Sequence, residues 1–306
     1  MDYFSAFDGI GAAHVALQPL GCNCVGVSEI DKFCNELIDK KYGFKNYGNF
    51  ENWREWGKIN VSLIAGGSPC TAFSLLGRRR GTADPAGQLT LEFVRFVCRN
   101  APKYFLWENV PQVLSVDGKR LWRGMLAQFS NRGYGLAWQV LDSRYFGVPQ
   151  SRRRIFLIGC FGSPTGAAEI LFDPETLPLP YITRPETGQA DTGAATFGHC
   201  TDSRGQRRTQ EHRERYRQNH STLGTLATQI DAGTEQINRL VLDNDRVRYL
   251  TPLECERLQG FPDNYTAGYS DTQRYKMVGN SMPVPVIRWL GQRILAVDRG
   301  TMAKAG

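Results

Sequence analysis

The chain lacks long hydrophobic runs, a leader-like start and paired cysteines, and each absence excludes a class of protein. No run of about eighteen apolar residues occurs in its 306 residues, so a membrane-spanning helix is not expected. The N-terminus reads as a strand without a basic segment, which argues against a signal peptide. We therefore expect a cytoplasmic protein with no membrane partner.

The eight cysteines are scattered, and none forms a C-x-x-C pair. Cys22 and Cys24 lie too close together for the usual metal knuckle. This usage predicts free thiols and no metal, and it excludes a disulfide framework.

What the chain does have is apolar content, positive charge and glycine-rich loops. With 41% hydrophobic residues it can bury a large core, as one large domain or two unequal ones. Its formal charge of +7 favours a polyanionic partner. The arginines gather at 78–80, between glycines, and at 204–217, among Thr, Gln, Asn and His. The first group suits phosphate contacts and the second a base-reading surface, although either could be solvated.

The N-terminal segment predicts a strand, a glycine turn and a helix. Residues 3–7 read as a buried strand, residues 8–11 as the turn, and the helix is expected to run to about Leu20. Gly9 and Gly11 match the first two glycines of a dinucleotide fingerprint, but His14 stands in place of the third. A nucleoside cofactor fits this turn better than NAD does.

The next strand, 24–28, ends at Glu29. Glu29 lies roughly 20 residues beyond the turn, where an acidic side chain binds ribose hydroxyls. A solvated glutamate at a helix start fits the spacing equally well.

Two further strands place reactive groups at their ends. The apolar run 61–65 empties into Gly66-Gly67-Ser68-Pro69-Cys70, which presents a thiol behind a proline, and strand 103–107 ends in Glu108. Because parallel strands end at one edge of a sheet, Cys70 and Glu108 can converge there.

A third segment, Gln150-Ser151-Arg152-Arg153-Arg154, precedes the strand 155–161. Alternation along a strand sends Arg152 and Arg154 to one face and Arg153 to the other. From Gly162 the periodicity fades, which places a domain boundary there. Order returns near Tyr249, with Thr251 as an expected helix cap and Pro252 as the first helical residue.

Together these segments resemble the cytosine-C5 DNA methyltransferases over nearly the whole chain. The motifs stand in the family's order: Phe7-Asp8-Gly9-Ile10-Gly11, Gly67-Ser68-Pro69-Cys70, Glu108-Asn109-Val110, Gln150-Ser151-Arg152-Arg153-Arg154, Arg257-Leu258-Gln259-Gly260-Phe261-Pro262 and Gly279-Asn280-Ser281. Parts of the chain are also similar to the subgroup of phage-encoded enzymes and vertebrate de novo methyltransferases.

The resemblance implies an α/β fold: a Rossmann-like mixed-sheet methyltransferase domain with a smaller, inserted target-recognition domain. The catalytic domain is expected over 1–162, the recognition domain and hinge over 163–270, and a returning C-terminal segment over 271–306. The implied protein is a monomer in the cytoplasm of a bacterium or a phage-infected host cell.

The implied activity is DNA (cytosine-5-)-methyltransferase, which moves a methyl group from S-adenosylmethionine to C5 of a flipped cytosine in double-stranded DNA. S-adenosylhomocysteine is the product, and a covalent bond joins Cys70 to C6 during the reaction. The catalytic residues implied are Cys70, Glu108, Arg152 and Arg154. DNA contacts are expected from Ser74, Arg78, Arg79, Arg80, Arg204, Arg207 and Arg208.

The cofactor residues implied are Phe7, Gly9, Gly11, Glu29, Ile30, Asn49, Phe50, Pro69, Leu89, Asn280 and Ser281. Two of them depart from the family. Ile30 stands where most members carry tryptophan, and Asn49 where most carry an aspartate at the end of the next strand. A weaker grip on ordinary S-adenosylmethionine is therefore expected.

Three alternatives remain open at this point. A catalytically silent DNA-binding member conflicts with the intact Cys70, Glu108 and Arg152. Methylation of transfer RNA would use the same catalytic residues, whereas the arginine-rich insertion at about 165–245 favours DNA. A modified donor carrying a carboxylate would need an additional cation near Asn280, and no motif indicates one.

Overall fold

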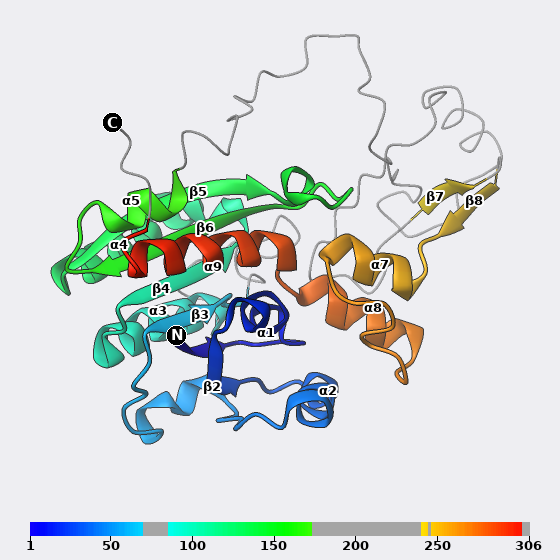
Figure 1. Ribbon diagram of the computed structural model, residues 1–306, viewed down its shortest axis with the longest axis horizontal. Coiled ribbons are helices and arrows are strands. Elements are labelled where there is room, and N and C mark those ends of the chain that lie inside the picture. Colours follow the sequence, from blue (N-terminus) through cyan, green and yellow to red (C-terminus); the bar gives the residue numbers. More distant parts are fainter. Residues whose placement is uncertain (70–84, 173–239, 244–245, 302–306) are drawn as a thin grey trace, which may run out of the picture.

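The computed structural model describes residues 1–69, 85–172, 240–243 and 246–301. At its centre is a six-stranded sheet in the order β2-β1-β3-β4-β6-β5 (Figure 1). The strands are β1 (Asp2–Ala6), β2 (Asn23–Ser28), β3 (Leu63–Gly66), β4 (Tyr104–Asn109), β5 (Tyr134–Asp142) and β6 (Arg153–Phe161). The first four are parallel, and β6 pairs antiparallel with both β4 and β5. The expected mixed α/β sheet is confirmed.

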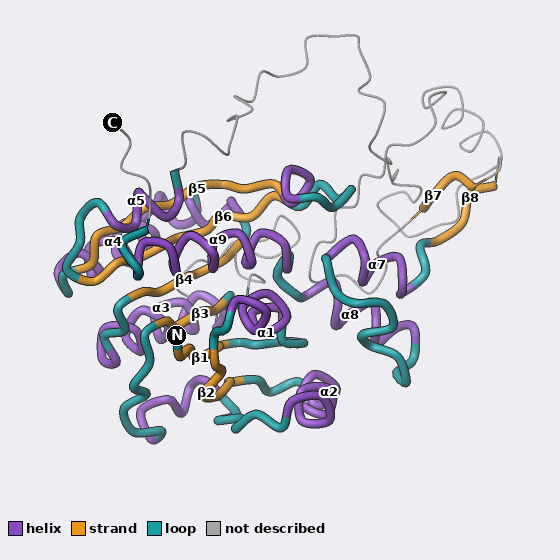
Figure 2. Tube along the Cα trace, in the orientation of Figure 1, coloured by secondary structure: helices purple, strands orange, loops and turns teal. Residues whose placement is uncertain are grey.

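Helices cover both faces of this sheet (Figure 2). The α-helices are α1 (Ala12–Leu17), α2 (Lys32–Tyr42), α3 (Pro85–Asn100), α4 (Arg120–Asn131), α5 (Gly166–Leu171), α7 (Pro252–Gln259), α8 (Asp271–Asn280) and α9 (Val284–Asp298). Short 3-10 turns are η1 (Gln18–Leu20), η2 (Phe50–Glu55), η4 (Pro111–Leu114), η5 (Val116–Lys119) and η6 (Ser143–Phe146), and β7 (Leu240–Asp243) pairs with β8 (Arg246–Tyr249). The helix expected to reach Leu20 ends at Leu17 and continues as η1, where Pro19 has no amide hydrogen to donate.

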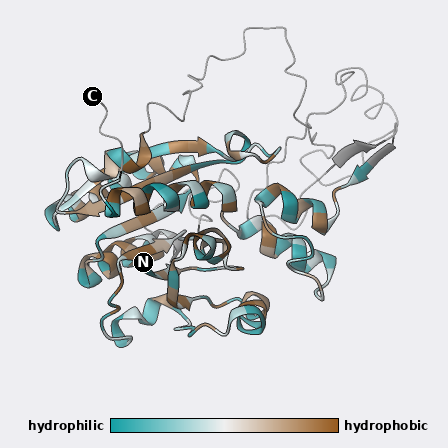
Figure 3. Cartoon of the chain, in the orientation of Figure 1, coloured by the Kyte–Doolittle hydropathy of each residue, from teal (hydrophilic) through white to brown (hydrophobic). Residues whose placement is uncertain are grey.

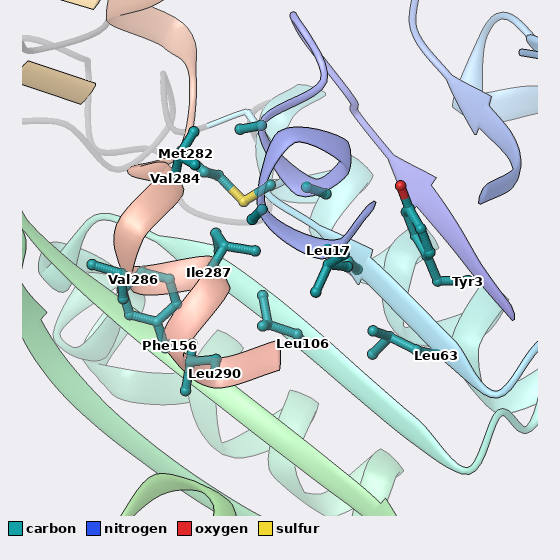
Figure 4. Close-up of a cluster of buried hydrophobic side chains, with 14 of the residues drawn as sticks. Tyr3, Leu17, Leu63, Leu106, Phe156, Met282, Val284, Val286, Ile287 and Leu290 are labelled. Carbon is teal, nitrogen blue, oxygen red and sulfur yellow. The ribbon is translucent and has the colours of Figure 1, made fainter. Parts of the chain in front are cut away.

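One apolar core lies between the sheet and the helices α1, α5 and α9. Leu17 of α1 and Ile287 of α9 pack in the same cluster as Leu106 and Phe156 of the sheet (Figure 4). All four side chains are at most 1% exposed. Burying each of them contributes about 1.5–3 kcal/mol.

The second core fills the opposite face, under α3, α4 and η2. It is rich in aromatic rings: the centroids of Phe105 and Phe129 lie 4.2 Å apart, and those of Phe4 and Phe96 lie 5.4 Å apart. Hydrophobic colouring follows the central strands and the helices against them (Figure 3). The sheet is therefore buried on both faces, as parallel sheets usually are.

Two segments beyond residue 162 also belong to this architecture. Ala167 and Ile170 of α5 are fully buried in the same core as α9. Helix α7 begins as expected: Thr251 and Glu254 form a capping box, and Pro252 is the first helical residue. In the described part of the chain, no helix has the length and apolar character needed to cross a membrane.

Candidate active site

The ends of β3 and β4 lie side by side at one edge of the sheet. A Cβ atom placed on Gly67 would stand 3.0 Å from Oε2 of Glu108 and 3.7 Å from the sulfur of Met282. Only a residue without a side chain allows this approach. The two strand ends therefore meet at Gly67 and Glu108. The convergence of Cys70 with Glu108 stays a prediction, because Cys70 lies outside the described residues.

Glu108 is a buried acid with a cationic neighbour. It is 8% exposed, and burial raises its pKa above the usual value, whereas the charges of Arg154 and Arg152 act in the opposite direction. Nε of Arg154 lies 3.2 Å from Oε1 of Glu108. The carboxyl sits below the surface, and the charges of its partners only partly offset the loss of water. The side chain can therefore hold a proton at pH values where an exposed glutamate cannot.

The arginine triplet divides between the two faces as alternation predicts. Arg152 and Arg154 are buried, and Arg153 is exposed. Nη2 of Arg152 donates to the carbonyl oxygens of Gly279, at 3.2 Å, and Ser281, at 2.7 Å. Arg154 is the ion-pair partner of Glu108. Arg152 instead joins the start of β6 to the connection between α8 and α9.

A buried polar cluster fixes the residue before Pro69. Oγ of Ser68 accepts a hydrogen bond from Nε1 of Trp107 at 3.1 Å and shares one with Oγ1 of Thr90 at 2.8 Å. The side-chain amide of Asn109 donates to the Ser68 carbonyl at 2.9 Å. Because Trp107 and Asn109 flank Glu108, this Ser68 cluster (Ser68, Thr90, Trp107 and Asn109) ties the two strand ends together. No motif or spacing in the sequence indicates this cluster; the one signal is strand alternation, which places Trp107 and Asn109 on the face opposite Glu108.

The glycine turn after β1 is bent through left-handed residues. Phe7, Gly9 and Gly11 have φ values of 54°, 59° and 78°. A Cβ atom on Gly11 would come within 2.7 Å of Ile38, whereas one on Gly9 would meet nothing within 4 Å. The turn therefore packs tightly on one side and leaves open space beside Gly9. The positive φ of Phe7 is backbone strain of the kind found at ligand sites.

Glu29 lies directly against this turn. Its Oε2 accepts from the amide of Gly9, and its Oε1 accepts from the amides of Ile30 and Asp31, each at 2.7 Å. Ile30 is 69% exposed, which is unusual for a large aliphatic side chain. A rigid carboxylate thus stands beside an apolar surface at the mouth of the turn.

The neighbouring segment differs from the expected pattern at Asn49. This residue does not end a strand; its Oδ1 caps η2 by accepting from the amide of Glu51 at 3.1 Å. The ring of Phe50 lies 4.4 Å from that of Phe7, centroid to centroid. The motif did not indicate this cap, because aspartate and asparagine are equally good N-cap residues and the exchange of one for the other carries no signal of capping.

Comparison with known proteins decides the family. The model of the C-5 cytosine-specific DNA methylases matches residues 1–165 and 180–296. The chain belongs to this family. The methylase resemblance drawn from the motifs is thereby confirmed, as is the enzyme class, a DNA (cytosine-5-)-methyltransferase.

The relatives of this methylase include bacterial enzymes of Type II restriction-modification. It is 30% identical to M.NlaX of Neisseria lactamica, over 95% of each chain. It is 29% identical to M.HpaII of Haemophilus parainfluenzae, over 96% of this chain and 88% of that one. M.HhaI of Haemophilus parahaemolyticus is 27% identical to it, over 95% of this chain and 93% of that one.

Solved structures share the methylase fold. A putative DNA modification methyltransferase encoded within a prophage of E. coli superposes with a TM-score of 0.65 at 19% identity, over 98% of this chain and 99% of that one. The Dnmt2 methyltransferase of S. pombe superposes with a TM-score of 0.62 at 20% identity, over 96% of this chain and 98% of that one.

The expected cofactor residues that follow β1, β2 and β3 stand at the same edge of the sheet, because these strands are parallel. The methyltransferase family implies S-adenosylmethionine, and the groups at this edge fit such a nucleoside donor. Beside the open space at Gly9 stand Glu29 and the exposed Ile30. Ser281, which follows α8, is 4% exposed, and its Oγ has no hydrogen-bond partner among the described residues. A buried hydroxyl without a partner is costly, and a ligand atom would satisfy it. Leu89 is half-buried on α3, and Asn280 is exposed at the end of α8.

Several expected residues lie outside the described part of the chain: Cys70, Ser74, Arg78, Arg79, Arg80, Arg204, Arg207 and Arg208. Among the residues that are described, no group of three or more His, Cys, Asp and Glu side chains could hold a metal ion.

Proposed function

We propose that this methylase transfers a methyl group from S-adenosylmethionine to C5 of a cytosine flipped out of duplex DNA, through a transient bond between Cys70 and C6. The observation that carries the proposal is the buried Glu108, ion-paired with Arg154 and in contact range of Gly67. Gly67 lies three positions before Cys70 in the sequence. An acid with a raised pKa beside the strand leading to a thiol suits addition to a pyrimidine ring.

The chemistry follows from the residues. The Cys70 thiolate forms a bond to C6, and the electron pair of the C5–C6 double bond moves toward C5 and N3. Glu108, holding a proton at its raised pKa, donates it to N3 and neutralises the charge there. Arg154 stabilises the resulting carboxylate. After methylation at C5, loss of the C5 proton to a base re-forms the double bond and releases the Cys70 thiolate, and N3 returns its proton to the Glu108 carboxylate.

The donor supplies an electrophilic methyl group when it is bound. Gly9 and Gly11 would let the donor approach the backbone closely. The carboxylate of Glu29 would accept hydrogen bonds from its ribose hydroxyls, and the hydroxyl of Ser281 would contact its methionine end. Ile30 presents less surface to an adenine than an indole does. The Oδ1 atom of Asn49 is already used in capping η2. Both features support the expectation that the donor is bound more weakly than is typical.

Duplex DNA is the proposed substrate, with recognition assigned to the segment 163–270. Arg78, Arg79 and Arg80 would contact phosphates, and Arg204, Arg207 and Arg208 would lie in the region that reads bases. The net charge of +7 supports a nucleic-acid partner.

The proposal is tested by trapping the covalent bond. Duplex DNA containing 5-fluorocytosine, incubated with the protein and S-adenosylmethionine, should give an adduct on Cys70, because fluorine cannot leave as a proton does. Cys70→Ser should bind DNA and donor but give neither adduct nor turnover, since a hydroxyl is far less nucleophilic than a thiolate. An adduct on another residue would contradict the proposal. So would transfer of a labelled methyl group from S-adenosylmethionine to transfer RNA in place of DNA. Mass spectrometry of the digested product should show 5-methylcytosine and no heavier adduct.

A further inference from the structure

The glycine turn is contacted by a tyrosine from the far end of the chain. The hydroxyl of Tyr265 donates to the carbonyl oxygen of Ile10 at 2.8 Å. It lies 3.0 Å from the hydroxyl of Tyr42. Since Tyr265 has only one hydroxyl proton and gives it to Ile10, Tyr42 is the donor in the second bond. Ile10 and Tyr265 are both buried, so water does not replace this bond.

The segment between α7 and α8 is built to hold Tyr265 in place. The carboxylate of Glu256, which is fully buried, accepts from the backbone amides of Tyr265 at 3.2 Å and Thr266 at 2.9 Å. Arg274 of α8 pairs with the same carboxylate at 3.0 Å. The ring of Phe261 lies 4.8 Å from that of Tyr265. The phenol therefore reaches the turn from a rigid support.

The turn is also held by a bond of its own, from the amide of Gly11 to the carbonyl of Asp8 at 3.1 Å, and by bonds to β2 and its end. The amide of Asp8 donates to the carbonyl of Ser28 at 3.0 Å, and the amide of Gly9 donates to Glu29 at 2.7 Å. These bonds hold the first half of the turn. Tyr265 holds the second half, between Gly9 and Gly11, where left-handed glycines leave the backbone most free.

We propose that Tyr265 is a positioning residue for the donor: it fixes the Ile10 carbonyl and so keeps the turn in its binding conformation before the donor arrives. This inference rests on the proposed function, in which Gly9, Gly11 and Glu29 hold S-adenosylmethionine. A turn that must be re-formed on binding lowers the apparent affinity by the fraction of molecules that hold the right shape. Tyr265 thus acts on donor binding and not on the chemical step.

The experiment compares single hydroxyl removals. Tyr265→Phe leaves the buried carbonyl of Ile10 without its hydrogen-bond donor. The dissociation constant of this variant for S-adenosylhomocysteine, measured by calorimetry without DNA, should rise roughly tenfold. Tyr42→Phe, which removes only the bond that orients the Tyr265 hydroxyl, should raise it about twofold to threefold. In methylation assays, KM for the donor should rise in the same order, with kcat at saturating donor unchanged.

Tyr275→Phe is the matched control. Tyr275 lies on α8, and its hydroxyl also donates to a backbone carbonyl, that of Leu250, which is not part of the glycine turn. It should lower the thermal midpoint without changing donor affinity, which separates positioning from general stability. If Tyr265→Phe binds as the wild type does, or loses kcat with KM unchanged, the inference is overturned. If Tyr265→Phe does not fold, unchanged affinity in Tyr42→Phe overturns it. A wild-type protein that fails to bind S-adenosylhomocysteine would overturn the donor assignment itself.

Discussion

Nη2 of Arg152 lies 2.7 Å from the carbonyl oxygen of Ser281. This contact joins the start of β6, where the buried arginines stand, to the segment that follows α8. The guanidinium is 4% exposed, and it also bonds to the carbonyl of Gly279. Arg152 therefore holds together two parts of the site that are distant in sequence.

Replacing Arg152 with Met should lower both stability and activity. Two buried carbonyls would lose their donor, and the free energy of unfolding should fall by about 2 kcal/mol in urea titrations. The value of kcat/KM should fall with it, because Ser281 shifts. Arg153→Met is the control, since this neighbouring side chain is exposed. Equal unfolding curves for the two variants would contradict a linking role for Arg152.

Glu108→Gln keeps the shape of the side chain but cannot donate the carboxyl proton. We expect kcat to fall by about two to four orders of magnitude, with donor affinity unchanged. Because burial raises the pKa of Glu108, the wild-type rate should decline on the alkaline side only above the range of an ordinary glutamate, and this limb should be absent from the variant. A loss below threefold, with chemistry shown to be rate-limiting, would remove Glu108 from the role of acid.

Ser68→Ala tests the Ser68 cluster. Removing Oγ leaves the indole of Trp107 and the hydroxyl of Thr90 without this partner, so the ends of β3 and β4 lose a link. We expect slower adduct formation with 5-fluorocytosine DNA, unchanged binding of DNA and donor, and a shift in tryptophan emission from Trp107. Ser115→Ala, at an exposed serine that bonds only locally to Gln112, should change none of these. Normal adduct kinetics with the emission shift present would limit the cluster to a packing role.

Asp8 should make stability depend on pH. Burial raises its pKa to about 7; the hydroxyl of Ser5 opposes this shift, and the charge of Glu29 adds to it. Because the unfolded value is about 3.9, the folded state binds more protons between the two values. The stability from Asp8 is thus complete below about pH 4 and is lost as the pH rises through about 7. The free energy of unfolding of wild type should fall across this window relative to Asp8→Asn, and parallel curves would refute the shift.

The sequence predicted the parts of this molecule that rest on local patterns. Alternation placed Arg152 and Arg154 on one face, and the capping residue Thr251 marked the start of α7 correctly. The parallel order of β3 and β4 brought Glu108 to the end of the strand before Cys70.

The other features of the site depend on contacts between residues whose separation in the sequence follows no regular pattern. The Ser68 hydroxyl meets Thr90 and Trp107, and Tyr265 meets Ile10, across gaps of 22, 39 and 255 positions. No periodicity connects such pairs, because the fold alone decides which polar groups must satisfy one another once water is excluded. Asn49 failed for a different reason. Its helix cap is a local contact, but the family motif assigned its side-chain oxygen to the cofactor.

The position of α9 sets the order in which the two cores can close during synthesis. Among the described residues, the buried side chains of the core under α3 and α4 all come from residues 4–157, so this core can form on a half-made chain. The opposite core waits for Ile287 and Leu290, which cover Leu106 and Phe156 (Figure 4). Until the ribosome has released α9, the nascent protein exposes the apolar part of its sheet that α9 covers. Chains that stop before residue 284 should therefore associate through that face and require chaperones to remain in solution.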